Sequence, residues 1–197
     1  MPGPLDALAL LEIGSVARAM RALDALVKEA PVTVVEANLV EPGKVLILYG
    51  GGVAEVASAH RVGREVAGED LLDEVMIPLV EPRVWSGIAG RQSVGDPDTV
   101  GVIEGRSVAS VILACDRCLK MAQVGLCGLR LSPALGGKGF FVIHGKQHDV
   151  DAALQIGADA LQERDRLVRA ERIGRPHPEF LAFLLRPAPF GAGIAGG

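Results

Sequence analysis

The chain contains an internal repeat. Residues 10–30 (LLEIGSVARAMRALDALVKEA) align with residues 102–122 (VIEGRSVASVILACDRCLKMA), and the matching residues differ by 92 in number. Further along the chain the difference becomes 94, which places Gly43 and Lys44 on Gly137 and Lys138. The second copy has therefore gained two residues between its middle strands. A repeat of this length predicts two copies of one structural unit in tandem.

Each copy has the same pattern of predicted elements. A short apolar strand (residues 8–13 and 100–104) precedes a helix with apolar residues at 4-3-4 spacing, which predicts a stripe that faces the core. Two predicted strands around the Gly-Lys turn, a second helix and a last strand follow. The stripe residues are Val16, Met20, Leu23 and Val27 in the first copy, and Val108, Ile112, Cys115 and Leu119 in the second.

The element order β-α-β-β-α-β predicts an α+β fold. We expect two tandem ferredoxin-like domains, each a four-stranded antiparallel sheet with helices on one face. The first domain is predicted at residues 5–84 and the second at residues 99–185. Residues 85–98 are rich in Gly and Ser and contain Asp-Pro, which predicts a linker. Residues 186–197 are mostly Gly, Ala and Pro, which predicts a flexible tail.

Composition limits the possible functions. A net charge of −4 and an isoelectric point near 5.6 argue against a nucleic-acid or anionic-membrane surface, because both need clustered Lys and Arg. The sequence begins without a basic leader, and no apolar run approaches the roughly 18 residues that span a bilayer. We therefore expect a cytoplasmic protein that binds neither membrane nor nucleic acid.

Residue types that often carry chemistry do not form a recognisable constellation. Cys115, Cys118 and Cys127 overlie aliphatic residues of the first copy, so we interpret them as small buried hydrophobes rather than as a metal or redox site. His60 overlies an aliphatic residue on the second helix and is predicted to be partly buried. There is no Ser-His-Asp order, zinc spacing or phosphate-binding fingerprint. We expect no catalytic residue, no metal and no cofactor.

Three features together resemble the bacterial microcompartment shell-protein domain. They are the opening LLEIGSVARAMRALDALVKEA, the Gly-Lys turn before the third strand, and IGRPHPEF at residues 173–180, in which Gly174 replaces the first Pro of the family's Pro-Arg-Pro-His ending. The resemblance covers nearly the whole chain twice and is similar to the tandem-domain, trimer-forming branch with unpermuted strand order. It implies a homotrimeric, pseudohexameric tile with a central pore for small metabolites. The tile would lie in the shell of a cytoplasmic microcompartment beside hexameric and pentameric shell proteins.

The resemblance also implies which residues line the pore. In the family, the loop between the second and third strands faces the axis. Three Glu41 carboxylates about 8 Å apart would repel by about 0.5 kcal/mol per pair in a wet lumen, which is tolerable. The second loop is longer, uncharged and rich in Gly, so it is the better candidate for a moving gate. The implied pore-lining residues are Val40, Glu41, Pro42 and Gly43 from the first copy, and Pro133, Ala134, Leu135, Gly136 and Gly137 from the second.

Several interpretations of these loops stay open. Without the family likeness Glu41 would be an ordinary solvated turn residue. Relatives that carry an iron–sulfur cluster have Cys where this chain has Glu41, so no such cluster is expected. Three Glu41 carboxylates could instead bind a hard cation. A weaker hypothesis is that two trimers stack face to face and thereby open or close the pore.

The resemblance finally implies a tile edge at the ends of the first helices. There Lys28 and Lys120 would pack against the neighbouring tile, with Arg83 and Arg175 as partners. The alternative is that the two Lys are solvated cations that favour the helix C-terminal dipole. An alternative for the whole chain is a trimeric, small-molecule-binding regulator, because fold alone does not settle function. An enzyme is the third alternative. The encapsulated pathway, the metabolite, the outward face and the ion preference of Glu41 stay open.

Overall fold

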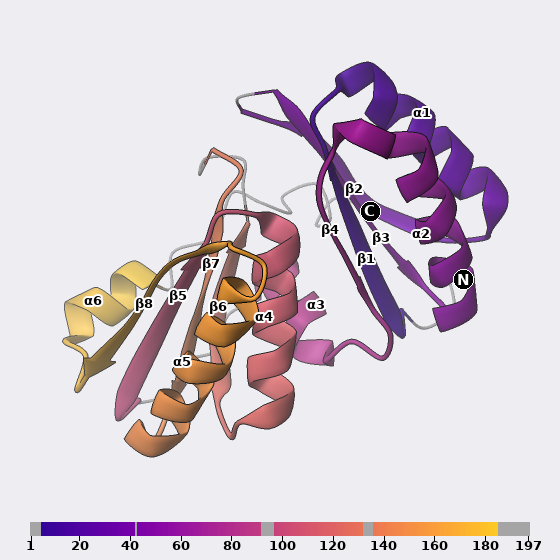
Figure 1. The fold of residues 1–197 in the computed structure, drawn as a ribbon. Helices are drawn as coiled ribbons and strands as arrows, with labels where there is room; N and C mark the ends of the chain where they lie inside the picture. Colours follow the sequence, from indigo (N-terminus) through magenta and orange to yellow (C-terminus); the bar gives the residue numbers. More distant parts are fainter. Residues whose placement is uncertain (1–4, 42, 92–96, 132–135, 185–197) are drawn as a thin grey trace. The chain divides into compact units, whose positions relative to one another are not determined.

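The computed structural model describes residues 5–41, 43–91, 97–131 and 136–184 (Figure 1). The chain divides into two compact units, residues 1–80 and residues 81–197. The predicted tail at residues 186–197 lies outside the described residues, as do Pro42, Pro133, Ala134 and Leu135 from the predicted pore loops.

Unit 1 has the predicted β-α-β-β-α-β order. Its sheet has the strand order β2-β3-β1-β4, and every neighbouring pair is antiparallel. Helices α1 and α2 pack against each other and against the sheet (Figure 1). The elements are β1 (Ala7–Ile13), α1 (Val16–Glu29), β2 (Thr33–Val40), β3 (Lys44–Gly51), α2 (Val53–Ala67), the 3₁₀ turn η1 (Gly68–Asp70) and β4 (Leu71–Ile77).

Unit 2 repeats this arrangement, with an added helix at each end. Its sheet has the order β6-β7-β5-β8, again antiparallel throughout. The two sheets confirm the predicted α+β fold of tandem ferredoxin-like domains with unpermuted strand order. The elements are α3 (Pro82–Ile88), β5 (Thr99–Gly105), α4 (Val108–Met121), β6 (Gly125–Leu131), β7 (Gly139–Gly145), α5 (Gln147–Gln162), β8 (Leu167–Gly174) and α6 (Pro178–Leu184).

The repeated Ser residues explain where the first helix of each unit begins. Ser15 is the N-cap of α1, and its hydroxyl accepts a hydrogen bond from the backbone N–H of Arg18 at 3.3 Å. Ser107 caps α4 in the same way, with the N–H of Ser110 at 3.3 Å. An N-cap side chain satisfies a donor that the first helical turn leaves unpaired. The matching Ser residues therefore fix the same helix start in both units.

The predicted core stripe of α1 is wrong in phase. The residues of α1 that are buried in the core are Ala19, Ala22 and Leu26, and Leu23 is only partly buried. The other stripe residues are exposed: Val16 by 37%, Met20 by 57% and Val27 by 42%. Small Ala side chains let the helix approach the larger side chains of the sheet closely. In α4 the predicted stripe of Val108, Ile112, Cys115 and Leu119 is buried.

Helix α3 lies where the sequence placed the end of the first domain and the start of the linker. In the structure α3 belongs to unit 2 and packs against β6 and α4. A Cβ atom at Gly87 would come within 2.8 Å of Leu126 and 3.0 Å of Leu129, so a larger residue would require these neighbours to move. From sequence alone Gly87 indicated a linker, whereas in the structure it packs within unit 2.

Helix α6 is a second element that the sequence analysis missed. Leu181 of α6 packs against a small core cluster on the sheet of unit 2, formed by Val100, Cys127 and Val142. Phe141 belongs to the other face of the sheet, where its ring would contact a Cβ placed on Gly157 of α5. Helix α6 therefore covers part of the face opposite α4 and α5.

Candidate functional site

The first predicted pore loop is the tip of the β2–β3 hairpin. Val40 lies opposite Lys44, and the N–H of Gly43 donates to the carbonyl of Val40 at 2.9 Å. Gly43 has φ 129°, which residues with a side chain rarely adopt. Val40 is buried, whereas Glu41 and Gly43 are exposed. Of the four predicted residues, the tip therefore presents Glu41 as an exposed acid and hides the side chain of Val40.

The second predicted pore loop joins β6 and β7. Its described residues include Gly136 and Gly137, with φ 59° and 80°. No atom lies within 4 Å of a Cβ placed on Gly136, so the requirement for Gly there is conformational rather than steric. The strands close with Leu131 opposite Gly139. The two hairpins are thus equivalent in topology and different in chemistry.

An ion pair lies beside the tip of each hairpin. Glu12 of β1 pairs with Lys44 of β3, and both side chains are largely buried. The equivalent pair in unit 2 joins Glu104 to Lys138 at 3.5 Å and is half-exposed. Burial strengthens an ion pair that is well matched and makes breaking it costly. The sequence analysis missed these pairs, although the repetition of both residues in the two copies was a usable signal.

The two Lys residues predicted at the tile edge have different surroundings. Lys28 pairs with Asp24 at 2.6 Å, and 72% of the Lys28 side chain is exposed. Lys120 makes the equivalent pair with Asp116 at 2.7 Å, but only 5% of the Asp116 side chain is exposed. Asp116 also accepts a hydrogen bond from the backbone N–H of Glu81 at 2.8 Å. Lys120 is therefore tied to the interior of unit 2, whereas Lys28 is on the surface.

Arg83 lies in α3 and joins three parts of unit 2. Its guanidinium donates to the carbonyls of Leu119 and Val124, each at 2.8 Å, and to the carboxylate of Glu81 at 2.6 Å. The hydrogen bond from Arg83 lowers the pKa of Glu81. Arg83 thus links α3 to the C-terminal end of α4 and to the residue that precedes β6.

Arg175 is not the structural equivalent of Arg83. Ile173 lies opposite Val100 in unit 2, as Ile77 lies opposite Leu8 in unit 1. Two residues further on, the equivalent positions are therefore Arg175 and Leu79. Both have positive φ, 48° and 54°. The structure does not bring the two predicted Arg residues to corresponding places.

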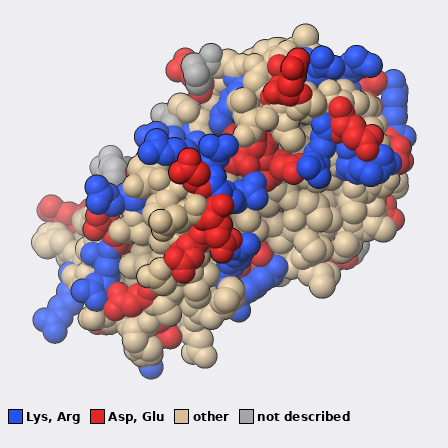
Figure 2. All heavy atoms as spheres, viewed as in Figure 1, with Lys and Arg blue, Asp and Glu red and all other residues tan. Residues whose placement is uncertain are grey.

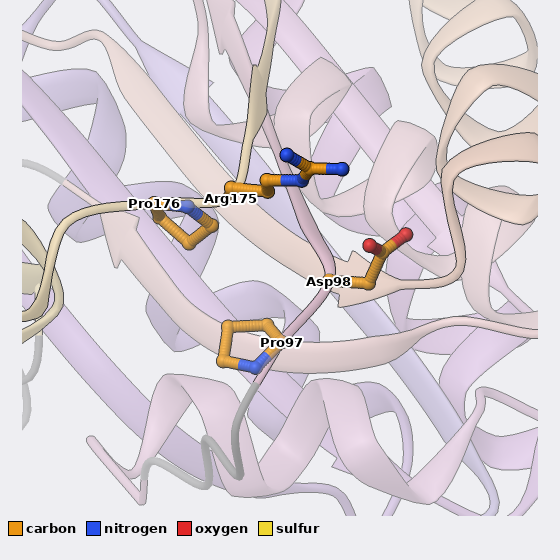
Figure 3. A pocket seen from close by; sticks show the side chains of 4 residues that line it. All are labelled: Pro97, Asp98, Arg175 and Pro176. Atoms are coloured by element: carbon orange, nitrogen blue, oxygen red, sulfur yellow. The ribbon is translucent and has the colours of Figure 1, made fainter.

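Arg175 borders an open pocket of about 400 Å³ (Figure 3). The backbone N–H of Arg175 donates to the carbonyl of Asp98 at 2.8 Å. The Asp98 carboxylate accepts from the N–H of Gln147 at 3.2 Å and from the hydroxyl of Thr99 at 3.3 Å. In Figure 3 the charged groups of Asp98 and Arg175 extend to one side of the pocket, and two proline rings lie on the other. The pocket lining is Pro97, Asp98, Arg175 and Pro176.

A buried polar chain that the sequence analysis missed crosses unit 1. The hydroxyl of Tyr49 lies 2.7 Å from Nδ1 of His60, and Nε2 of His60 lies 3.1 Å from the carboxylate of Glu74. Arg64 also contacts Glu74, at 2.6 Å. Burial, followed by the charge of Arg64, lowers the pKa of His60 to about 4. Nδ1 of His60 thus shares a hydrogen bond with the Tyr49 hydroxyl, and Nε2 faces the Glu74 carboxylate. This agrees with the prediction that His60 is partly buried.

The three Cys residues are buried free thiols, as predicted. Burial raises the pKa of Cys118 and of Cys127 to about 12, and it also raises the pKa of Cys115. Cys118 donates to the carbonyl of Ala153 at 3.1 Å. These thiols stay protonated at neutral pH and behave as small apolar side chains.

Among the described residues, no group of three or more His, Cys, Asp or Glu is placed to hold a metal ion. No described helix combines the length and the apolar character needed to cross a bilayer. On the face shown in Figure 2, acidic and basic side chains are interspersed.

Comparisons with known proteins assign the family. Residues 7–80 and 99–176 each match the BMC domain. The chain is 35% identical over 172 residues to the bacterial microcompartment shell protein PduT of Citrobacter freundii, which covers 87% of this chain and 94% of PduT. It is 38% identical over 81 residues to the carboxysome shell protein CsoS1 of Prochlorococcus marinus, which covers 41% of this chain and 77% of CsoS1.

A solved structure shows the same arrangement of elements. The crystal structure of a microcompartment protein from Desulfitobacterium hafniense superimposes with a TM-score of 0.79 at 34% identity, over 90% of this chain and 98% of that chain. The BMC domain thus matches most of the chain, and a tandem relative matches nearly end to end. The chain therefore belongs to the BMC-domain family and carries two BMC domains in tandem.

Proposed function

We propose that this protein is a structural tile of a bacterial microcompartment shell, in which three chains form a closed ring of six domains around a pore. The observation that carries the proposal is the full-length match to a shell protein, with two BMC domains in one chain. The tile lies in the shell inside the cell, where hexameric and pentameric shell proteins surround it. Its role is structural, without a catalytic step.

The exposed stripe of α1 supports assembly into a ring. Val16, Met20 and Val27 form an apolar row on one helix face that the described residues of unit 1 leave 37–57% exposed. The equivalent row of α4 is buried. An apolar helix face of this kind is typical of an interface with another subunit. A head-to-tail contact that repeats around an axis closes into a ring, and three chains supply six domains.

The two hairpins supply the proposed pore. Three copies of Glu41 would give the ring three carboxylates at one radius, and three copies of the β6–β7 tip would add uncharged, glycine-containing loops. The buried pair of Glu12 with Lys44 fixes β3 directly after the tip of the first hairpin, whereas the half-exposed pair of Glu104 with Lys138 leaves the second tip freer. We therefore assign the fixed charged ring to unit 1 and the movable gate to unit 2.

The alternative functions have less support. The relatives reported above are shell or microcompartment proteins, and none supports a ligand-binding regulator. Face-to-face stacking of two trimers stays a prediction, which the particle mass will check.

Two measurements test the proposal. Native mass spectrometry should give a particle of roughly three times 20.5 kDa, because an obligate ring buries well over about 1,000 Å² at each interface. Coexpression with hexameric and pentameric shell proteins should place the chain in closed shells, seen by electron microscopy and by immunolabelling. A monomer that stays outside the shells would contradict both the ring and the tile.

A further inference from the structure

Helices α3 and α6 occupy the same place in the repeat. Both are seven residues long and begin with a Pro, at Pro82 and at Pro178. Each Pro comes five residues after an Ile of the last strand, Ile77 or Ile173, and these two Ile lie opposite equivalent residues of β1 and β5. In both helices the side chain just before the Pro accepts a hydrogen bond from the N–H of the second helical residue. Helix α6 is therefore the second copy of α3.

Helix α3 follows the last strand of unit 1 in the sequence but packs within unit 2. It contacts β6 and α4 there (Figure 1). A Cβ atom placed on Gly87 would lie 2.8 Å from the side chain of Leu126 and 3.0 Å from the Cβ atom of Leu129. Both Leu residues are buried. A helix in this place of the repeat thus packs on the second strand and the first helix of the domain that follows it.

The equivalent surface of unit 1 is accessible. The strand register places Val34 and Ala37 of β2 where β6 has Leu126 and Leu129. Val34 is half-buried and Ala37 is exposed, whereas both Leu residues of β6 are buried. The second strand of unit 1 therefore offers to a partner the surface that α3 covers in unit 2.

A polar contact shows the same difference between the units. In unit 2 the buried carboxylate of Asp116 accepts a hydrogen bond from the N–H of Glu81, the residue just before α3, at 2.8 Å. The equivalent acid in unit 1 is Asp24, whose side chain is 59% exposed. The equivalent donor is the N–H of His177, the residue just before α6. A carboxylate is a strong acceptor for such an N–H, so Asp24 can receive the start of a copy of α6.

Helix α6 differs from α3 at the position of closest contact. Phe183 stands in α6 where α3 has Gly87. A Phe at this place would require the two Leu residues of β6 to move, because even a Cβ atom there is crowded. The smaller Val34 and Ala37 leave room for it in unit 1. Interfaces that conserve volume in this way, large against small and small against large, pack without strain. The sequence of α6 therefore fits unit 1 and not unit 2.

We propose that α6 of each chain docks on unit 1 of the next chain in the trimer, over β2 and the C-terminal end of α1. Phe183 lies against Val34 and Ala37, and Asp24 accepts the N–H that precedes α6. Leu181 keeps its contact with the sheet of its own unit 2, so that α6 bridges two chains. This inference rests on the proposed trimer and identifies the segment of the partner that covers unit 1.

The polar anchor of α3 is not repeated in α6. Arg83 donates to two carbonyls of unit 2, and Glu179 stands at the equivalent position of α6. A carboxylate has no proton to donate to a carbonyl, so α6 lacks these two hydrogen bonds. Its contact therefore depends on apolar burial, and aromatic residues carry much of the binding energy of such interfaces.

An exchange of volume tests the contact. Ala37→Leu gives β2 the side chain that β6 has at this position, so it should raise the dissociation constant of the trimer by crowding Phe183. Phe183→Gly should raise it by about tenfold or more at each contact, as the loss of a buried aromatic anchor does. Ala37→Leu/Phe183→Gly should restore assembly, because it reproduces the pair of Leu129 with Gly87. Native mass spectrometry over a range of chain concentrations will measure the trimer fraction.

A neighbouring substitution separates the contact from the helix itself. Ala182 is exposed beside Phe183, and Ala182→Gly lowers the helix propensity of α6 without changing the docked face. It should leave the dissociation constant of the trimer unchanged. Circular dichroism should show that each variant is folded, since Ala37 is exposed in the chain. An effect of Ala182→Gly as large as that of Phe183→Gly would overturn the role of Phe183.

A disulfide tests which chain is the partner. Because a Cβ atom on Gly87 would lie 3.0 Å from that of Leu129, positions 183 and 37 should be close enough for a disulfide, in which the Cβ atoms are about 3.8 Å apart. Oxidised Ala37→Cys/Phe183→Cys should therefore migrate as three linked chains on a denaturing gel and as one chain after reduction. Each single variant should migrate as one chain, because the natural Cys residues are buried.

The remaining outcomes are also decisive. A disulfide that forms within one chain would overturn a second copy as the partner. A double variant Ala37→Leu/Phe183→Gly that assembles no better than the single variants would overturn the contact of Phe183 with Ala37. If neither single substitution weakens the trimer, α6 does not dock on unit 1, while the proposed tile stands. A wild-type chain that is not trimeric would instead contradict the proposed function itself.

Discussion

Tyr49, His60 and Glu74 form a buried polar chain at positions where unit 2 has only aliphatic side chains. The repeat and the strand register place Ile143, Leu154 and Ala170 at these positions. The fold therefore does not require polar groups there. Burying polar groups costs free energy unless they have partners. Here Tyr49 is hydrogen-bonded to His60, and the Glu74 carboxylate lies within ion-pair distance of His60 and Arg64.

The burial of His60 predicts that the stability of the fold depends on pH. The pKa of His60 is lowered from 6.5 to about 4 by burial, so the unfolded chain binds a proton in this range that the folded chain does not. Stability should be complete above pH 6.5 and should fall between pH 6.5 and about 4, by up to about 3 kcal/mol. Urea unfolding at several pH values will measure the slope.

A double variant gives unit 1 apolar side chains at two of these positions, as in unit 2. Tyr49→Phe/His60→Leu removes the titrating ring together with the hydroxyl that would otherwise lose its partner. Its unfolding free energy should vary less with pH between 6.5 and 4 than that of the wild type. Equal slopes for both proteins would rule out His60 as the source. His148→Leu, which removes an exposed histidine, is the control.

Arg83 gives a second prediction at this scale. Arg83→Ala removes the donors to two carbonyls at the junction of α3, α4 and β6. The unfolding free energy of the chain should fall by about 1–3 kcal/mol, as for other hydrogen bonds that involve a charged group. Arg175→Ala, the control, should change the melting temperature far less. If Arg83→Ala left stability unchanged and only impaired tile contacts, the residue would be an edge residue instead.

At the scale of the element, the helices divide into those that sequence periodicity predicts and those that it does not. The element order of both units and the N-caps at Ser15 and Ser107 follow from patterns that repeat along the chain. The phase of α1 does not, because its most apolar stripe lies outward and Ala residues face the core. Periodicity identifies an apolar stripe without saying whether its partner belongs to the same chain.

Short helices and side-chain contacts were also beyond sequence analysis. Gly and Ser around Gly87 are typical of linkers, and only the packing against Leu126 and Leu129 reveals the helix. The Lys residues of the two copies looked alike, yet the burial of Asp116 separates Lys120 from Lys28. Such differences depend on long-range contacts that one sequence does not contain. The pore residues of the second loop, except Gly136 and Gly137, lie outside the described residues.

The outward stripe of α1 predicts that a charge there will prevent assembly. Met20 is 57% exposed in the chain, so Met20→Glu should be tolerated by the folded monomer. In the ring it would place an unpaired charge in an apolar interface, which is strongly unfavourable. Native mass spectrometry should show monomers with unchanged circular dichroism. Glu65→Gln on the exposed face of α2 is the control, and a trimeric Met20→Glu protein would contradict the role of the stripe.

At the scale of the whole molecule, the charge of the proposed pore comes from three Glu41 carboxylates, one from each chain. Only unit 1 contributes an acid at its hairpin tip, so Glu41→Gln should remove the fixed charge of the ring while the backbone stays in place. Trimers reconstituted in a planar bilayer should then lose cation preference. Glu36→Gln, on the flanking strand, is the matched control for a surface carboxylate. Unchanged conductance and selectivity after Glu41→Gln would show that the carboxylates are not at the constriction.

The two extra residues between β6 and β7 have a consequence for how such a tile can change during evolution. In a ring of six identical chains, an insertion of two residues would crowd the axis with twelve residues, and any useful loop would have to suit all six positions at once. In the proposed trimer the same insertion adds six. Gene fusion thus allows one set of loops to diverge toward opening and closing while the other set keeps the diameter of the channel.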